Sequence, residues 1–211
     1  CEPISPIETE TAVTPANIVS SILAPGTTVN ITKTDCPFGA YGTFSFPTDN
    51  NDLGLQKGLV LTTGAVDLVA GPNDLPGASQ FNFTPGDAQL DYLSVLQGNS
   101  DPSFDACIVE MDVFVASDEL TFEYVFGSEE YPEYVSSDFN DVLGVWVNGQ
   151  YVPITIGDGT TAINNINPVK EPNLFISNTN DRYNTEMDGF TLTLKLTIPV
   201  KPGLANTNRI G

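Results

Sequence analysis

The most regular pattern in the chain is an alternation of apolar and polar residues that runs over eleven positions, from residue 190 to residue 200. A period of two is typical of a β-strand with one buried face and one solvated face. The same period recurs over residues 107–115 and 120–126. Within 107–115 it leaves Glu110 and Asp112 on the face opposite the apolar one, so two acids share a polar strand face.

A β-hairpin is predicted around Asn148 and Gly149, which lie between the apolar runs 142–147 and 151–156. Asn-Gly is the strongest short hairpin turn, because both residues tolerate positive φ. Further strands are expected at residues 27–32, 41–46, 59–62 and 174–177.

Two short helices interrupt this strand pattern. Thr14 followed by Pro15 is a helix-start signal, and apolar residues within 18–23 then form one side of a helix. Thr84 with Asp87 three residues later has the spacing of a capping box, and three leucines then recur at helical intervals. Many short strands with only two small helices predict an all-β protein, a β-sandwich of Greek-key or jelly-roll type.

The length of 211 residues suits one domain. Residues 1–13 are rich in Pro, Glu and Thr without an apolar period, which predicts a tether, and the domain is expected over residues 14–211. The longest apolar runs are far short of the roughly 20 residues that a membrane-spanning helix needs. No transmembrane segment is predicted.

Charge and composition exclude several functions. The net charge is -20, so the chain lacks the basic surface that nucleic-acid binding requires. The chain contains no histidine, which excludes Ser-His-Asp and Cys-His relays and the His-based zinc sites. Carboxylate chemistry remains.

The acidic residues concentrate where basic ones are absent. No Lys or Arg occurs between Gly58 and Val169, so the carboxylates of that segment have no ion-pair partner nearby in the sequence. One interpretation is a solvated acidic face that serves solubility. The other is a bound cation: carboxylates, Asn side chains and backbone carbonyls are the ligands that Ca²⁺ prefers, and the metal would relieve the repulsion on folding. We favour calcium.

Three cysteines, Cys1, Cys36 and Cys107, share no metal-binding spacing. Cys107 lies on the apolar side of its predicted strand, so it is either a buried free thiol or the disulfide partner of Cys36 in an oxidising compartment. A chain that begins with Cys1 and continues into a tether looks like a mature bacterial lipoprotein. A bridge from Cys1 to Cys36 and an arbitrary start of the sequence are the alternatives.

The segment from Phe126 to Val147, FGSEEYPEYVSSDFNDVLGVWV, joins two predicted strands by a loop rich in polar groups. It resembles the choice-of-anchor L domain, a family of bacterial surface and secreted proteins with an aromatic-small-Ser-Glu-Glu-Tyr block followed by Phe-Asn-Asp. Other landmarks of that family are similar here, in the family's order: Gly58–Gly64, Ala70–Asn73, Pro85–Asp87, Asp105–Ala106, Val109–Asp112, Ile163–Asn167 and Asp188–Thr191. The resemblance covers residues 14 to the end.

The chain departs from the family in two ways. The family continues past the last strand, whereas this sequence stops at 208–211, which predicts that final strands are missing and that a sheet edge is left open. No sorting tail is present either, so the type of anchor stays open. The resemblance implies a surface context and little about activity.

The Glu-Glu block has three interpretations. The first is a calcium site, with the ligands Glu129, Glu130, Asp138, Asn140, Asp141, Asp112 and Asp188. The second is a glycosidase. Glu129 and Glu130 point to opposite faces of a strand and cannot form its acid pair, so Glu129 would act with Asp141 or Asp112. The third is a structural role, with polar groups bonding the loop backbone.

Four aromatic residues accompany this loop, namely Tyr131, Tyr134, Phe139 and Trp146. We expect them to pack under the loop, although exposed aromatics would suit a lectin.

The sequence thus predicts a non-catalytic, calcium-stabilised structural or adhesion protein, outside the cell or on the bacterial surface, that contributes to attachment or to matrix, filament or appendage assembly. Its partners would be other surface proteins or copies of itself that complete the open sheet edge. The alternative is a carbohydrate-binding module, or an accessory domain of a polysaccharide-acting enzyme, with a glycan as ligand. The oligomeric state and the metal's identity stay open.

Overall fold

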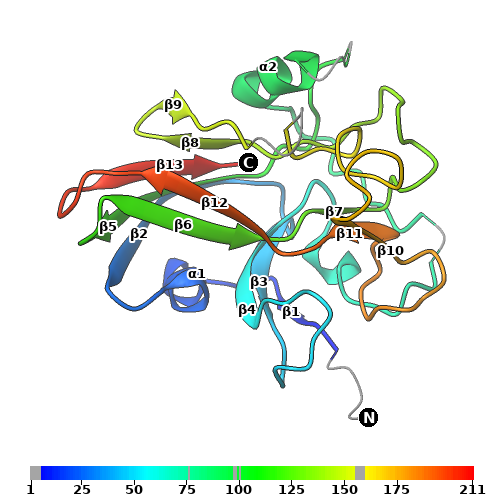
Figure 1. Cartoon of the computed structure of the whole chain (residues 1–211), viewed down its shortest axis with the longest axis horizontal. Helices are drawn as coiled ribbons and strands as arrows, with labels where there is room; N and C mark the ends of the chain where they lie inside the picture. Colours follow the sequence, from blue (N-terminus) through cyan, green and yellow to red (C-terminus); the bar gives the residue numbers. More distant parts are fainter. Residues whose placement is uncertain (1–5, 76, 97–98, 100, 155–159) are drawn as a thin grey trace.

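The computed structural model describes residues 6–75, 77–96, 99, 101–154 and 160–211 (Figure 1). Two α-helices are described, α1 (Pro15–Ile22) and α2 (Ala88–Leu96), with a short 3₁₀ helix at Val66–Leu68. The strands are β1 (Glu8–Glu10), β2 (Thr27–Asp35), β3 (Tyr41–Ser45), β4 (Lys57–Leu61), β5 (Ile108–Val115), β6 (Glu119–Tyr124), β7 (Gly127–Ser128), β8 (Val145–Val147), β9 (Gln150–Tyr151), β10 (Phe175–Ser177), β11 (Gly189–Thr191), β12 (Leu194–Pro199) and β13 (Asn206–Ile210).

The largest sheet has five antiparallel strands in the order β2-β5-β13-β8-β9. The pair β6–β12 lies across one face of this sheet (Figure 1). Two smaller sheets, β1-β3-β4 and β10-β11-β7, complete the molecule. This mostly β architecture confirms the prediction of an all-β sandwich.

The core lies between the five-stranded sheet and the elements that cover its inner face. Val109, Met111 and Val113 of β5 point inward and are almost fully buried, in contact with Leu120 of β6. Each such apolar side chain contributes roughly 1.5–3 kcal/mol by leaving water. The alternation seen in the sequence at 107–115 therefore reflects a true inner and outer face.

The two helices cover opposite faces of the five-stranded sheet. Ile22 at the end of α1 packs against the inner cluster of β5. Leu90 and Leu93 of α2 pack instead against Ile108 and Trp146, which belong to the outer face. α2 thus buries the apolar residues Ile108 and Trp146 of the outer face, whereas Phe114 on the same face of β5 is exposed.

Both helices start close to the predicted positions, but the second has a different cap. The Thr14 side chain and Asn17 form a capping box at the start of α1. At α2 the cap is Asp87, whose Oδ1 accepts from the N–H groups of Gln89 (2.9 Å) and Leu90 (3.3 Å). The expected role of Thr84 was wrong, since its N–H and hydroxyl donate to Asp105.

The hairpin at Asn148 and Gly149 is confirmed: β8 and β9 pair across it, and both turn residues have positive φ. Its second strand is shorter than the apolar run predicted, because β9 ends at Tyr151. Residues 155 and 156 of that run lie outside the described part of the chain.

The single long strand predicted over 190–200 was wrong. β11 pairs with β7 and β10, whereas β12 pairs with β6, so the chain changes sheet near residues 192–193. The Thr193 hydroxyl donates to the carbonyl of Leu53 at this crossing, and Leu192 is exposed. Alternation is a local property, and it does not reveal which neighbour each half of a run will find.

Both ends of the described chain differ from expectation. Within the predicted tether 1–13, residues 8–10 form β1, which pairs with β3, and Ile7 is buried. Cys1 lies outside the described residues. Residues 206–210 form β13, which fills a central place between β5 and β8 and not an edge. The edge strands of this sheet are β2 and β9.

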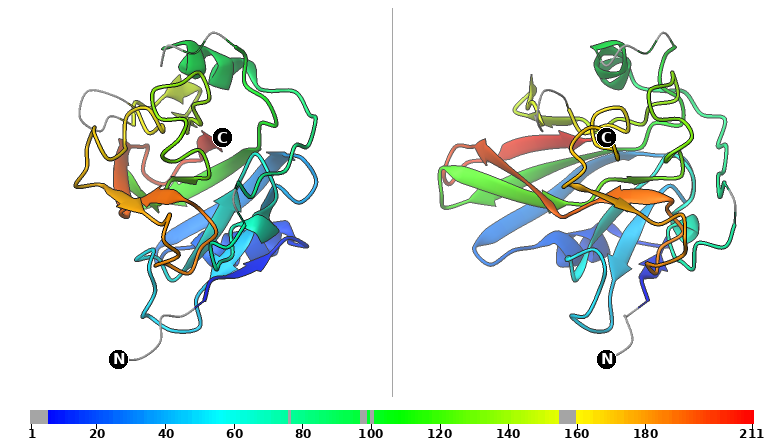
Figure 2. Two further views of the ribbon diagram at one scale, coloured as in Figure 1. Left: turned by 90° about the vertical axis from the view of Figure 1, so that its right-hand side faces the viewer. Right: turned by 45° about the vertical axis from the view of Figure 1, so that its right-hand side comes forward.

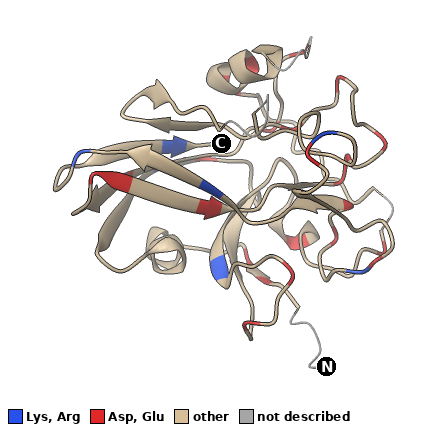
Figure 3. Cartoon of the chain, viewed as in Figure 1, with Lys and Arg blue, Asp and Glu red and all other residues tan. Residues whose placement is uncertain are grey.

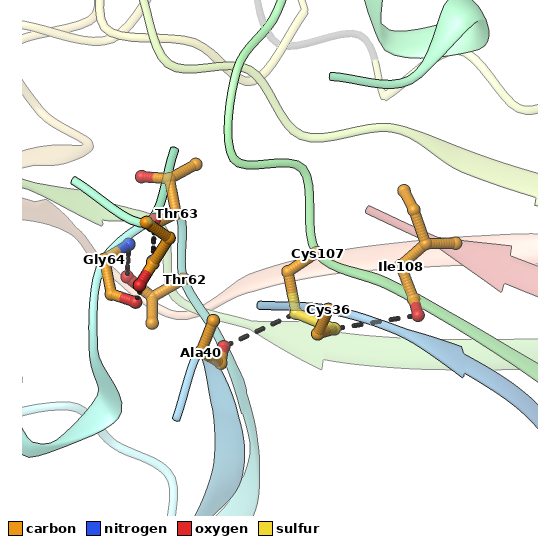
Figure 4. The surroundings of a disulfide bond; sticks show 8 residues. Cys36, Ala40, Thr62, Thr63, Gly64, Cys107 and Ile108 are labelled. Atoms are coloured by element: carbon orange, nitrogen blue, oxygen red, sulfur yellow. Dashed lines mark hydrogen bonds between the residues drawn. A yellow bond between two sulfur atoms is a disulfide. The ribbon is translucent and has the colours of Figure 1, made fainter. Parts of the chain in front are cut away.

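Cys36 and Cys107 form a disulfide that joins the end of β2 to the chain entering β5, with Cα atoms 4.0 Å apart. Figure 4 shows the bond beside Ala40 and Ile108. The two cysteines are 71 residues apart, and closing a loop of that size stabilises the folded state by about 4 kcal/mol in the chain-entropy model. Such a bond fits an oxidising compartment.

Candidate functional site

The Ser-Glu-Glu-Tyr segment begins where β7 pairs with β11. Ser128 lies opposite Gly189, so Glu129, directly after β7, comes close to Asp188, directly before β11. Gly189 is required at this point, because a Cβ atom there would approach the rings of Tyr131 and Phe175 to less than 3 Å. The two landmarks 128–131 and 188–191 therefore meet in space.

Three carboxylates, Glu129, Glu186 and Asp188, hold the loop formed by residues 70–78, and we call them the acidic clamp. Oε2 of Glu129 accepts from the Ala78 N–H (3.1 Å), and its Oε1 accepts from the Asp188 N–H (3.2 Å). Glu186 accepts from the Leu75 N–H (2.8 Å). Asp188 accepts from the side-chain amide of Asn73 (3.0 Å). The clamp satisfies backbone and amide donors of a loop that has no regular secondary structure.

The loop approaches the clamp closely at Gly71. A Cβ atom at this position would lie 2.6 Å from the backbone nitrogen of Thr185, so only glycine fits. Ala70 and Thr185 form an isolated β-bridge beside it. The landmark 70–73, distant in sequence, is thus part of the same site.

Asn178 organises the other wall of the site. Its side chain is fully buried, and its Nδ2 donates to the carbonyls of Tyr183, Thr185 and Met187 at 2.8–3.3 Å. Its Oδ1 accepts from the Tyr183 N–H (2.8 Å). One asparagine therefore shapes the turn that carries Glu186 and Asp188 into place.

The electrostatics of the clamp follow from burial and like charge. Burial raises the pKa of Glu129 to about 7, and the neighbouring charges of Asp188 and Glu186 add to the rise, while the two backbone N–H donors oppose it. Near neutral pH this carboxyl group is therefore partly protonated.

A second cluster of carboxylates, Glu130 and Asp141, lies in the same segment but has different partners. Burial raises the pKa of Asp141, although the Ser128 hydroxyl donates to it (2.7 Å) and opposes the rise. The pKa of Glu130 is raised by burial and then by the charges of Asp141 and Glu133. Glu129 and Glu130 thus belong to different groups, although they lie in a turn after β7 and not on a strand as predicted.

The seven predicted calcium ligands are not brought together. Glu129 and Asp188 lie in the clamp, and Glu130 and Asp141 form the second group. Of the other three, Asp138 is exposed, Asn140 accepts from the N–H of Asn164, and Asp112 accepts from the Thr207 hydroxyl on the five-stranded sheet.

Acidic residues are spread over many loops (Figure 3). Among the described residues, no three acidic or cysteine side chains are placed to hold one metal ion. The structure therefore does not bring the seven predicted ligands together, and the calcium site and calcium stabilisation stay predictions.

The four aromatic residues predicted to pack under the loop lie in different environments. Tyr131 is fully buried, and its ring lies against that of Phe175 with centroids 4.8 Å apart and planes inclined by 51°. Its hydroxyl donates to the Ile166 carbonyl, so it packs under the loop as expected. Tyr134 and Phe139 contact each other but are largely exposed. Trp146 lies in a different place, under α2.

Two members of this site were missed from the sequence, Asn178 and Glu186. Both occur in a stretch of polar residues, Ser177–Glu186, that has the composition of an ordinary loop. Asn178 is 0% exposed and Glu186 is 3% exposed. Their burial depends on contacts with residues 69–78, more than a hundred positions away. No local signal in the sequence identifies them.

The landmarks 70–73, 128–131 and 188–191, far apart in the sequence, thus meet at one place in the fold. A comparison with protein families matches residues 6–210 to the choice-of-anchor L domain. The chain belongs to this family. Membership identifies it as a bacterial surface or secreted protein. No curated protein and no solved structure matches the chain. No helix among the described residues is long and apolar enough to span a bilayer.

Proposed function

We propose that this choice-of-anchor L domain is a non-catalytic structural or adhesion module that contributes to attachment or to matrix or appendage assembly at the bacterial surface. The proposal rests on the hydrogen bonds that the three carboxylates of the acidic clamp accept. Both oxygens of Glu129 and one oxygen each of Glu186 and Asp188 accept hydrogen bonds from backbone or amide groups of the protein itself. These carboxylates hold a loop in shape.

A glycosidase would need a different arrangement. Its two carboxyl groups flank an open sugar site and face each other across the scissile bond. Here Glu129 and its two candidate partners, Asp141 and Asp112, have separate hydrogen-bond donors. These are the N–H of Asp188 for Glu129, the hydroxyl of Ser128 for Asp141 and the hydroxyl of Thr207 for Asp112. Two surface hollows, one beside α1 and one beside α2, are lined by residues outside the Ser-Glu-Glu-Tyr segment.

In this proposal, a strand of a partner pairs with the edge strand β2. It is nine residues long and, in the described part of the chain, pairs only with β5. An edge strand presents unpaired backbone groups to which a strand of another chain can add. A register shift between Ile31 and Lys33 interrupts this edge, and the charge of Lys33 adds to that protection, so addition would concern residues 27–31.

The proposal is tested by attachment and turnover measured on the same preparation. Beads that carry the folded domain should be retained by cells of the source bacterium more strongly than beads that carry the reduced and alkylated domain. The same protein, incubated with a panel of polysaccharides, should release no reducing ends above the level of the Glu129→Gln variant. Release that depends on Glu129 would overturn the non-catalytic assignment, and equal retention of both bead types would overturn the attachment role.

A further inference from the structure

A surface hollow of about 280 Å³ lies between α2 and the β8–β9 hairpin, away from the acidic clamp. Both views of Figure 2 place α2 above this hairpin. The hollow is lined by Gln89, Tyr92 and Leu93 of α2 and by Trp146 and Tyr151 of the hairpin. Ala88 and Gly149 complete the lining, and we call the site the aromatic hollow because three of its side chains are aromatic.

The rings of the hairpin are fixed by their neighbours. Trp146 and Tyr151 are cross-strand partners with ring centroids 5.8 Å apart. On the adjacent strand β13 the guanidinium of Arg209 lies over the Trp146 ring, 5.0 Å from its centroid. Arg209 is in turn held by Asp87 (2.5 Å) and Glu110 (3.6 Å). The floor of the hollow is therefore rigid before any ligand arrives.

The helix side of the hollow is open to solvent. Tyr92 is 64% exposed, whereas Trp146 is only 5% exposed and forms the floor. An exposed aromatic ring next to fixed aromatic side chains offers a ligand one accessible wall and a preformed base. The Gln89 side chain adds an amide donor and an acceptor at the rim.

The chemistry of the lining selects the ligand. Sugar rings combine apolar C–H faces, which pack on aromatic rings, with hydroxyl groups, which bond to amides and phenols. The volume lies just below the roughly 300 Å³ at which small-molecule sites begin, which suits one ring and not a larger group. The net charge of -20 disfavours an anionic ligand.

We propose that the aromatic hollow binds one sugar unit of a neutral polysaccharide, with Tyr92 and Tyr151 packing on the ring and Gln89 bonding to a hydroxyl. The inference gives a ligand class to the attachment role proposed above and rests on it in one respect: the sugar is bound and not cleaved.

The chain provides its own reporter, because Trp146 is its single tryptophan. The test titrates the folded domain with neutral hexasaccharides of β-1,4-glucose, β-1,4-N-acetylglucosamine, β-1,4-mannose, β-1,4-xylose and β-1,3-glucose, and follows tryptophan emission. Oligogalacturonate serves as the anionic comparison. At least one neutral probe should change the emission saturably below 5 mM, and the anionic probe should not.

Two variants locate the site. Tyr92→Ala removes an exposed ring and should weaken binding of the active probe at least tenfold, while the thermal midpoint stays within a few degrees. Tyr134→Ala removes another partly exposed tyrosine, far in sequence from the hollow, and should bind as wild type.

Two outcomes overturn the inference: no saturable change with any of the five neutral probes at 5 mM, or equal affinity of Tyr92→Ala and wild type. Chromatography of each probe after the titration separates this from the proposed function. Shortened probe would contradict the non-catalytic role, whereas intact probe without an emission change would contradict the aromatic hollow alone.

Discussion

At the scale of single residues, polar side chains that bond to the backbone organise the loops, both at the acidic clamp and elsewhere in the molecule. Asn178 makes four hydrogen bonds to main-chain atoms of residues 183–187, and Asp105 accepts from the N–H groups of Asn82 and Thr84. Burial of Asp105 by itself would raise its pKa, but these hydrogen bonds outweigh it and hold the pKa below the ordinary value. Irregular loops need such partners because they lack a ladder of their own.

Replacing Asn178 should be costly. Asn178→Ala removes the side-chain partner of three carbonyls and one N–H, which are buried or part-buried, and each unsatisfied buried group costs free energy. We expect the free energy of unfolding to fall by roughly 2–4 kcal/mol, measured by urea denaturation. Asn30→Ala, an exposed asparagine of β2, is the control and should change stability by less than about 0.5 kcal/mol. Similar losses for both variants would contradict the assigned role.

Glu129 should make stability depend on pH. Its pKa in the folded protein is about 7, above its ordinary 4.5, so between these values the folded state binds more protons than the unfolded state. The Glu129 share of stability is therefore fully present below pH 4.5 and is lost as the pH rises through about 7. The urea midpoint of Glu129→Gln minus that of wild type should therefore increase from pH 5 to pH 8, because only the wild type loses this contribution.

The matched control for this series is Glu119→Gln at the start of β6, an exposed position. Its midpoint difference from wild type should stay constant over the same pH range. A constant difference for Glu129→Gln as well would show that the surroundings do not raise the pKa of Glu129.

At the scale of elements, the disulfide is the main covalent restraint. It fixes the end of β2 next to the start of β5, the two strands that pair over eight registered positions. The double variant Cys36→Ser/Cys107→Ser should lose about 2–5 kcal/mol of unfolding free energy, because the unfolded chain gains conformational freedom.

Guanidinium denaturation checks this expectation, with wild type measured with and without a reducing agent. Reduced wild type should approach the double variant, whereas the agent should leave the double variant unchanged. Stability within 0.5 kcal/mol of wild type in the double variant would mean that the bond is dispensable.

The elements also show where pattern reasoning reaches its limit. The hairpin at 148–149 and the helix at 15–22 were predictable, because turn and cap residues act on their immediate neighbours. The strand β13 reads Asn-Thr-Asn-Arg-Ile and has no apolar alternation, yet it is central in the sheet, with Asn206 and Asn208 fully buried. The Oδ1 of Asn206 accepts from the N–H of Lys201 and its Nδ2 donates to that residue's carbonyl, contacts that only the folded chain provides.

At the scale of the whole molecule, the net charge of -20 governs the response to salts. No three acidic or cysteine side chains in the described part of the chain are placed to hold one metal ion. We expect Ca²⁺ and Mg²⁺ at equal concentration and ionic strength to raise the thermal midpoint by similar amounts, since both screen the same repulsion.

Differential scanning calorimetry in each salt, and after addition of EDTA, distinguishes this screening from a specific site. The calcium site predicted from the sequence requires a rise that Ca²⁺ produces, Mg²⁺ does not and EDTA reverses, because a ligand that binds the native state alone must stabilise it. That result would mean that the site assembles from oxygens other than the acidic side chains considered above.

The sequence by itself determined the class of fold and the family. The class of fold depends on the period of apolar residues, which every stretch of chain carries locally, and the family was recognised from motif residues such as Ser128–Tyr131. Only the tertiary structure decided which carboxylates meet. It joined residues 70–78 to Glu129 and Asp188, left Asp112 on another sheet, and brought α2 over Trp146. Such meetings depend on contacts between segments tens to more than a hundred residues apart, and no local pattern encodes their geometry.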